Sequence, residues 1–204
     1  MRLHHAAATA ALALCLTACG GGGGETTTDP PTLGDESSSS SEPPSETPPA
    51  DSEDSGELAG DYPDVELSFG SLPEVRGSQR DALAAYVTYE HGLRKLSRTA
   101  KINSELRKVA GEPLMPTLRN TMAYLRNNDL RYAGPTAIDV SVNGGNDRVV
   151  VLDLCTDASR LRLVKDGKKR PVEGLQRAKG RVTLNSGGTN AWKVTDYTTL
   201  EEPC

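Results

Sequence analysis

The sequence predicts an α+β domain, with N-terminal helices packed on a curved antiparallel sheet and a disordered spacer before them. Three observations predict this order. Residues 1–60 divide into an apolar leader and a tract too polar to bury a core. Between residues 79 and 127, apolar side chains recur with the helical period of 3.6. From residue 137 they alternate with the period of two that strands require.

Residues 1–18 have the pattern of a secretory signal. The segment begins with basic Arg2 and continues as an apolar run over residues 6–16. This run is much shorter than the ~20 residues of a membrane-spanning helix. It ends in Leu16-Thr17-Ala18-Cys19, which resembles the lipobox of bacterial lipoproteins, Leu-(Ala/Ser/Thr)-(Gly/Ala)-Cys, at every position.

The lipobox resemblance implies that Cys19 is the lipidation site. Its thiol would carry diacylglycerol, cleavage before it would make it the mature N-terminus, and two or more acyl chains would hold the protein stably on the membrane. An ordinary cleaved signal is the alternative. We therefore expect an extracytoplasmic protein on the outer face of the cell membrane.

Residues 19–60 are predicted to be the lipidated cysteine and a disordered acidic spacer. Gly, Ser, Thr, Pro, Asp and Glu dominate the tract, and it contains ten acidic and no basic side chains. Such a segment buries too little apolar surface to offset its ordering entropy. A plain tether is expected, and a glycosylated one is the alternative. The remaining residues, 61–204, form one domain with a net charge of about +4, which is too small to indicate nucleic acid binding.

Two cysteines, Cys155 and Cys204, remain once the signal and the lipidated residue are set aside. A pair in an exported chain predicts a disulfide, and free thiols are the alternative. The mature chain has one histidine, His91, so soft ligands are too few for a metal site. No metal and no cofactor are expected.

Three helices are predicted. The first covers about 79–98, with an apolar stripe and a Ser78-x-x-Asp81 capping box at its start. The second covers 104–110 and ends at Gly111. The third covers about 116–127. Ordered structure is expected to begin only after Pro73. The apolar stripe of the first helix consists of Ala82, Tyr86, Tyr89, Leu93 and Leu96.

Five strands complete the predicted domain as an antiparallel meander. Turns are predicted at Asn143-Gly144, at Asp166-Gly167 and at residues 186–188. The second strand is apolar on both faces, so we expect it at the centre of the sheet. The strands cover about 137–142, 148–156, 160–165, 176–185 and 191–199.

Helices followed by antiparallel strands resemble the nuclear transport factor 2-like (SnoaL-like) superfamily. Residues 80–204 resemble secreted bacterial lipoproteins that carry such a domain. The similar stretches are Val-Leu-Asp-Leu-Cys-Thr-Asp-Ala-Ser at 151–159, Lys-Asp-Gly-Lys at 165–168, Ala-Trp-Lys-Val at 191–194, and Cys204. The resemblance implies a cone-shaped domain with a sheet wrapped around a long first helix. Its enzymatic relatives are isomerases, dehydratases and cyclases, and many others bind or assemble.

A cone of this kind can hold a ligand between sheet and helices. The candidate lining residues are Tyr86, Tyr89, Tyr124, Asp153 and Trp192. If Asp153 were buried, its pKa would rise and it could act as a base. The alternatives are core packing for the aromatic residues and an outer-face position for Asp153. His91 lies off the apolar stripe and is expected to point to solvent.

Basic residues recur along two of the predicted strands. Arg177, Lys179 and Arg181 share one face, and Arg160 and Arg162 lie on the strand before. Antiparallel pairing would gather them, together with residues 168–170 of the intervening loop, into a cationic patch. The patch could contact anionic lipid, wall polymer or the acidic spacer. A solvated face without a partner is the alternative.

The sequence therefore predicts a membrane-anchored lipoprotein that acts as a non-catalytic binding or interaction module at the cell envelope. Expected partners are the membrane itself and an envelope protein, wall polymer or small apolar ligand, and not nucleic acid. One alternative is a small pocket enzyme of the isomerase or dehydratase type with Asp153 as base. The other is a structural envelope protein that uses only its cationic face.

Overall fold

The computed structural model describes residues 58, 60–172, 176–188, 191–200 and 202–204. The predicted signal, the predicted lipidation site Cys19 and nearly all of the predicted spacer therefore lie outside the described residues. In the described part of the chain, every helix and strand lies between Asp61 and Thr199. No helix there has the length and apolarity that crossing a membrane requires.

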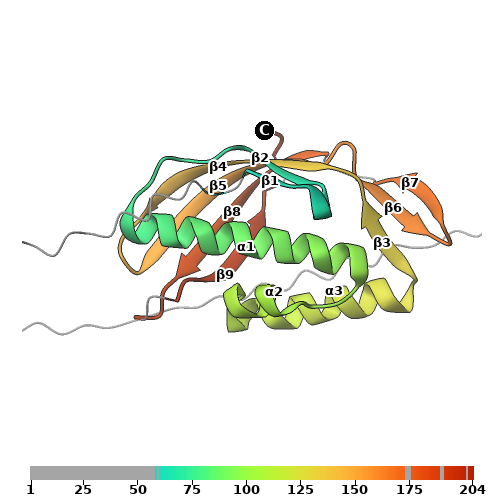
Figure 1. Cartoon of the computed structure of the whole chain (residues 1–204), viewed down its shortest axis with the longest axis horizontal. Coiled ribbons are helices and arrows are strands. Elements are labelled where there is room, and N and C mark those ends of the chain that lie inside the picture. The colour runs from blue at the N-terminus through green and yellow to red at the C-terminus, as the bar shows by residue number, and fades with distance from the viewer. Residues whose placement is uncertain (1–57, 59, 173–175, 189–190, 201) are drawn as a thin grey trace, which may run out of the picture. The chain divides into compact units, whose positions relative to one another are not determined.

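A mixed six-stranded sheet forms the main layer of the domain (Figure 1). Its order is β1-β2-β4-β5-β8-β9, and β2 runs parallel to β4 while the other neighbours are antiparallel. β5 lies inside the sheet, between β4 and β8, and buries Val150, Leu152 and Leu154 on one face. The strands are β1 (Asp61–Tyr62), β2 (Leu67–Ser71), β4 (Thr136–Gly145), β5 (Val149–Asp157), β8 (Arg177–Asn185) and β9 (Lys193–Thr199).

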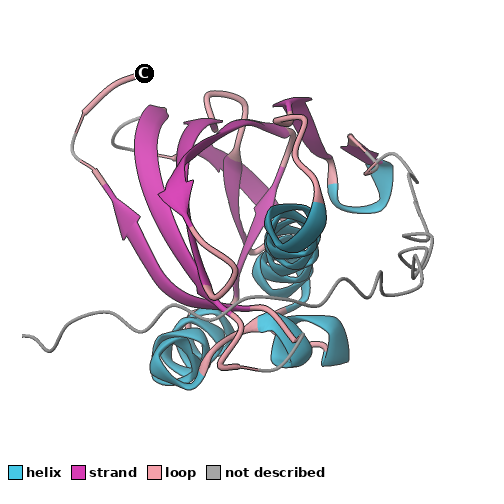
Figure 2. Ribbon diagram, turned by 90° about the vertical axis from the view of Figure 1, so that its left-hand side faces the viewer, coloured by secondary structure: helices cyan, strands magenta, loops and turns pink. Residues whose placement is uncertain are grey.

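Helix α1 (Gly77–Thr99) lies along one face of this sheet, as Figures 1 and 2 show. Its apolar stripe turns inward. Leu83, Tyr86 and Leu96 are almost completely buried, in the same apolar cluster as Leu152 and Val182 of the sheet. The helix ends at Thr99. The C-cap residue Ala100 has a left-handed backbone, and its N–H donates to the Leu96 carbonyl. The other helices are η1 (Pro63–Val65), α2 (Ser104–Val109), η2 (Glu112–Leu114) and α3 (Met115–Asn127).

A second sheet of three strands, β3 (Leu130–Ala133), β6 (Arg162–Lys165) and β7 (Lys168–Pro171), has the order β3-β6-β7. A small apolar cluster of Ala100, Leu125 and Leu130 supports it from the helices. The β6–β7 hairpin lies at one end of the domain in Figure 1.

The predicted fold class is wrong. β1 and β2 precede α1, so the helices are inserted between β2 and β3 and are not N-terminal. The parallel β2–β4 pair also makes the sheet mixed and not antiparallel, which differs from the expected nuclear transport factor 2-like cone. The sequence hid β2 because only Leu67 and Phe69 mark its buried face. Ordered structure thus begins before Pro73.

Several local predictions are also wrong. Asn143-Gly144 does not form the hairpin turn, because β4 continues to Gly145 and shifts register between Val142 and Gly144. The capping box is not formed, since Ser78 Oγ donates to Asp147 Oδ1 and the helix has no side-chain cap. Residues 168–170, expected in a loop, lie in β7.

Candidate functional site

One face of α1 contributes both charged and apolar side chains to a pocket of about 250 Å³. Leu93 and Arg94 follow Glu90 by three and four residues, and Ser97 lies four and three residues beyond them. These spacings place the four side chains on the same side of the helix. The pocket thus has apolar walls and a few polar groups, which is the usual composition of a small-ligand site. The facing residues are Tyr132, Ile138, Thr156, Leu161 and Tyr197.

Glu90 is buried at the inner side of this pocket, with 3% of its surface exposed. Tyr86 Oη donates a hydrogen bond to Glu90 Oε1 at 3.3 Å, and Tyr197 of β9 hydrogen-bonds to the same carboxyl group. Loss of solvent raises the pKa of Glu90, and the Arg94 charge and the two tyrosine hydroxyls offset only part of that rise. Burial, with the nearby carboxylate, also raises the pKa of Tyr86 and of Tyr197.

Arg94 is half-buried one turn after Glu90. Burial lowers its pKa, and the charge of Glu90 counteracts this effect. In the part of the chain that the structure describes, no hydrogen bond or ion pair engages the Arg94 guanidinium. A guanidinium has five donors in a planar fork that matches a carboxylate or phosphate. The pocket therefore offers unused donors to an anionic group on a ligand.

A second, larger hollow of about 520 Å³ lies on the opposite face of the six-stranded sheet. Asp153, on β5, faces Arg181 of β8 across the strands, with Arg181 Nε donating to Asp153 Oδ1 at 2.7 Å. This hydrogen bond lowers the pKa of Asp153, and Asn143 adds a second donor. An exposed carboxylate with a lowered pKa is poorly suited to act as a general base.

The five predicted lining residues are not brought together in one pocket. Tyr86 and Tyr89 are buried in the core beside Glu90, and Trp192 is buried near the start of β9. Tyr124 is 58% exposed on α3. Asp153 lies on the outer sheet face.

The five predicted surface cations are likewise divided between two sheets. Arg177, Lys179 and Arg181 lie on β8, where Lys179 Nζ is 3.3 Å from Glu202 Oε2 and Arg181 pairs with Asp153. Arg162 lies on β6, which pairs with β3 and β7 and not with β8, and Arg160 precedes it. The two sets therefore do not gather by strand pairing as expected.

The Sγ atoms of Cys155 and Cys204 are joined in a disulfide, with 5.8 Å between the Cα atoms. The bond fixes the C-terminal segment over the outer face of the sheet, where Leu200, Glu202 and Cys204 line the larger hollow. Within the described residues, no group of three or more His, Cys, Asp or Glu side chains is placed to hold a metal ion.

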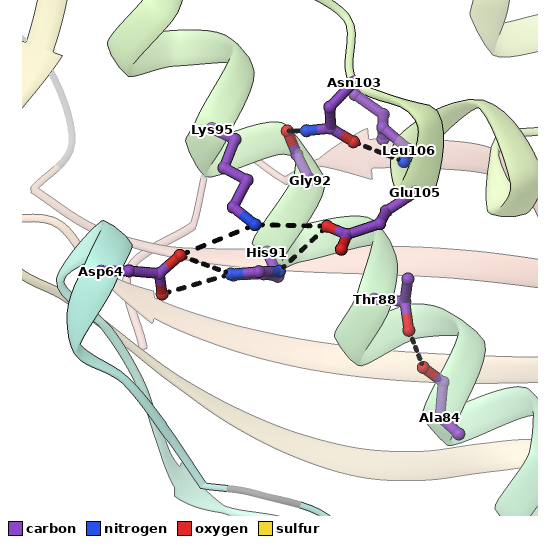
Figure 3. A network of polar contacts seen from close by, with 9 residues as sticks. All are labelled: Asp64, Ala84, Thr88, His91, Gly92, Lys95, Asn103, Glu105 and Leu106. Carbon is purple, nitrogen blue, oxygen red and sulfur yellow. Dashed lines mark hydrogen bonds and ion pairs between the residues drawn. The ribbon is translucent and has the colours of Figure 1, made fainter.

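His91 does not point to open solvent as expected, and only 14% of its side chain is exposed (Figure 3). Its Nε2 is 3.1 Å from Asp64 Oδ2, and its Nδ1 is 3.5 Å from Glu105 Oε2. Lys95 Nζ contacts the same two carboxylates. The hydrogen bond to His91 lowers the pKa of Asp64. This cluster ties η1 and α2 to α1, so we assign it a structural role.

Sequence reasoning missed Glu90 and Arg94, although a signal for them exists. Glu90 lies four residues after Tyr86 and three before Leu93, so it falls within the apolar stripe of the helix. A charged side chain at a core position needs a partner or a function. The partner, Tyr197, comes from β9, and no local pattern could identify it.

Comparisons with known proteins leave the family open. No family model and no curated protein matches the chain. A crystal structure of the intermembrane space region of the chloroplast protein ARC6 is similar over 64% of this chain and 100% of that chain, with 13% sequence identity and a TM-score of 0.46. A similarity of this size says nothing about function, which is argued below from the side chains.

Proposed function

We propose that this chain is an exported lipoprotein, anchored through Cys19 to the outer face of the cell membrane, whose domain is a non-catalytic binding module. The pocket beside α1 binds a small ligand that combines an apolar body with an anionic group. One observation supports this proposal most directly. The Arg94 guanidinium lines the pocket and has no hydrogen bond or ion pair among the described residues.

Each part of the pocket has a role in this proposal. Arg94 binds the anionic group through two parallel N–H donors, an arrangement that is geometrically specific and strong when partly desolvated. Leu93, Ile138 and Leu161 contact the apolar body. Glu90 stays bonded to the tyrosine hydroxyls and holds the inner wall in place.

The pocket can be tested with three probes that share one apolar chain: hexanoate, hexan-1-ol and hexylamine. We expect saturation-transfer NMR to detect hexanoate alone, because only the carboxylate pairs with Arg94. Arg94→Gln should weaken hexanoate binding at least tenfold. Arg126→Gln, which removes an exposed arginine from the end of α3, is the matched control and should change nothing. Equal binding of hexanoate and hexanol, or full binding by Arg94→Gln, would show that the proposal is wrong.

The anchor has a separate test that does not depend on the pocket. Replacing Cys19 with serine removes the only thiol that the lipobox resemblance assigns to lipidation. We expect the variant protein to appear in the soluble extracytoplasmic fraction, whereas the wild type sediments with membranes and enters the detergent phase. Membrane retention of Cys19→Ser would contradict the lipid anchor and leave the pocket proposal unaffected.

A further inference from the structure

The β6–β7 hairpin and the residues just before it form a strongly basic part of the chain. Residues 158–172 contain one acidic side chain, Asp166, and six basic ones. Asp166 and Gly167 both have positive φ values, 49° and 72°, as a two-residue turn of the I′ type requires. The six basic residues are Arg160, Arg162, Lys165, Lys168, Lys169 and Arg170.

Strand register brings like charges together at the tip of this hairpin. Lys165 of β6 lies directly opposite Lys168 of β7. Like charges at opposed positions destabilise a pair of strands. The hairpin therefore keeps an arrangement that is unfavourable for its own folding.

The basic side chains project from both faces of the hairpin. Arg170 pairs with Leu163, so it shares the face of Lys165 and Lys168, whereas Lys169 pairs with Val164 and lies on the other face. All four residues of β7 are exposed. Among the described residues, no ion pair or hydrogen bond engages the side chains of Lys165, Lys168, Lys169 or Arg170.

The cations of β8 differ in this respect. Arg181 is paired with Asp153, Lys179 with Glu202, and Arg177 lies directly opposite Asp157 in the strand register. The two groups have the same charge, but Lys179 and Arg181 are held in ion pairs with acids, whereas Lys165, Lys168, Lys169 and Arg170 have no ion pair among the described residues.

We propose that the β6–β7 hairpin docks the domain on an anionic phospholipid surface. The cations are spread over the tip and both faces of the hairpin, an arrangement that can contact many anionic headgroups at once. A site for a single small anion would instead need donors that point toward one position. Each Lys or Arg near an anionic membrane contributes about 1 kcal/mol, which is roughly a fivefold gain in partitioning. Three such residues together give a gain on the order of 100-fold.

Charged side chains on an open edge strand also prevent sheets from pairing edge to edge. That role predicts that neutralising β7 would produce oligomers and leave lipid binding unchanged. The docking proposal predicts a loss of lipid binding by a protein that stays monomeric.

The test uses the chain from Gly20 to Cys204, which lacks the lipid, so that the hairpin alone can bind. Sedimentation is measured with vesicles of phosphatidylcholine alone and with equimolar phosphatidylcholine and phosphatidylglycerol. We expect binding to the anionic vesicles only, and we expect it to weaken as salt is added. The triple variant Lys168→Gln, Lys169→Gln, Arg170→Gln should lose on the order of 100-fold in partitioning.

The matched control is the triple variant Arg177→Gln, Lys179→Gln, Arg181→Gln, which removes the same charge from β8. It should lose less than about fivefold, since Lys179 and Arg181 are in ion pairs and Arg177 lies opposite Asp157. Equal losses in the two triple variants would show that net charge alone drives binding, and would overturn the proposal. So would a wild-type protein that ignores anionic vesicles. Circular dichroism and light scattering check that each variant is folded and monomeric.

The acidic spacer of this chain is the competing binding partner for the basic hairpin. Changing its ten acidic residues to their amides in the same chain tests this, and we expect at most a small gain in vesicle binding. If wild-type binding were undetectable and appeared only after that change, the spacer would be the occupant and the docking proposal would be wrong. Arg94→Gln should bind vesicles like the wild type, so this test is independent of the pocket.

Discussion

Glu90 is an ionisable side chain held in the apolar interior between α1 and the sheet, with 3% of its surface exposed. Its carboxyl group meets two tyrosine hydroxyls, and the charge of Arg94 lies nearby without a direct ion pair. Burial of a charge with incomplete compensation destabilises a fold. Residues of this kind cluster at binding and catalytic sites more often than elsewhere.

The raised pKa of Glu90 makes a prediction about stability and pH. Because this pKa lies above its ordinary value of 4.5 in the folded state, the folded protein retains a proton that the unfolded chain has lost. The contribution of Glu90 to stability should therefore be greatest below pH 4.5 and fall as pH rises through the folded pKa. Glu90→Gln keeps the contacts to the tyrosines but does not titrate, so its stability relative to wild type should increase with pH.

Urea unfolding of both proteins from acidic to neutral pH measures this difference. Other groups titrate equally in the two proteins, so the difference between the curves isolates residue 90. Two curves that stay parallel over the whole range would mean that the Glu90 carboxyl is fully compensated by its neighbours.

At the scale of elements, α1 and α2 approach each other closely at Gly92. A Cβ atom at this position would lie 2.7 Å from the Leu106 Cβ. The Gly92 carbonyl also accepts a hydrogen bond from Asn103 Nδ2, and Asn103 Oδ1 caps α2 by accepting from the Leu106 N–H. Gly92 is therefore a packing requirement of the helix pair, shown in Figure 3.

Gly92→Ala should destabilise the domain although alanine is the better helix former. The preference for alanine is worth about 1 kcal/mol, whereas forcing an added methyl group into a packed contact costs about 1–3 kcal/mol. The midpoint of thermal unfolding should fall. An unchanged or raised midpoint would show that α2 moves away freely.

Elements with long apolar periodicity could be predicted from the sequence, and short or polar ones could not. Residues 79–98 and 116–127 were expected as helices and correspond to α1 and α3. β2 shows only two buried apolar residues, and β7 shows none, so neither stands out from a loop. The parallel β2–β4 pair joins two segments that are far apart in the sequence, with α1, α2 and α3 between them. No local pattern encodes that contact.

The candidate site was predicted less well than the elements that form it. Tyr86 and Tyr89 were placed on the inner face of their helix, but Asp153 was considered as a pocket base and lies on the outer face beside Arg181. The alternation of side chains along the strand places Asp153 on the same face as Cys155. Only the complete sheet shows which of its two faces the helices cover. The sign of its pKa shift depends on Arg181 across the strand pair.

For the whole molecule, the disulfide closes a long loop. Cys155 and Cys204 are 49 residues apart. In the chain-entropy model, a loop of that length contributes about 4 kcal/mol by restricting the unfolded chain. Guanidinium unfolding with and without reductant should show a loss of that order, and Cys155→Ala with Cys204→Ala should reproduce it. Identical unfolding curves would mean that the reduced chain is already restricted by other contacts.

The β1–β2 ribbon covers the edge of β4 that would otherwise end the sheet. A truncation boundary chosen just before α1 removes this cover. It leaves β4 with a free row of backbone N–H and C=O groups, which is a template for strand addition by another molecule. Recombinant versions of the domain that begin near residue 74 should therefore aggregate and be poorly soluble, whereas versions that retain residues 58–71 keep the edge of β4 covered.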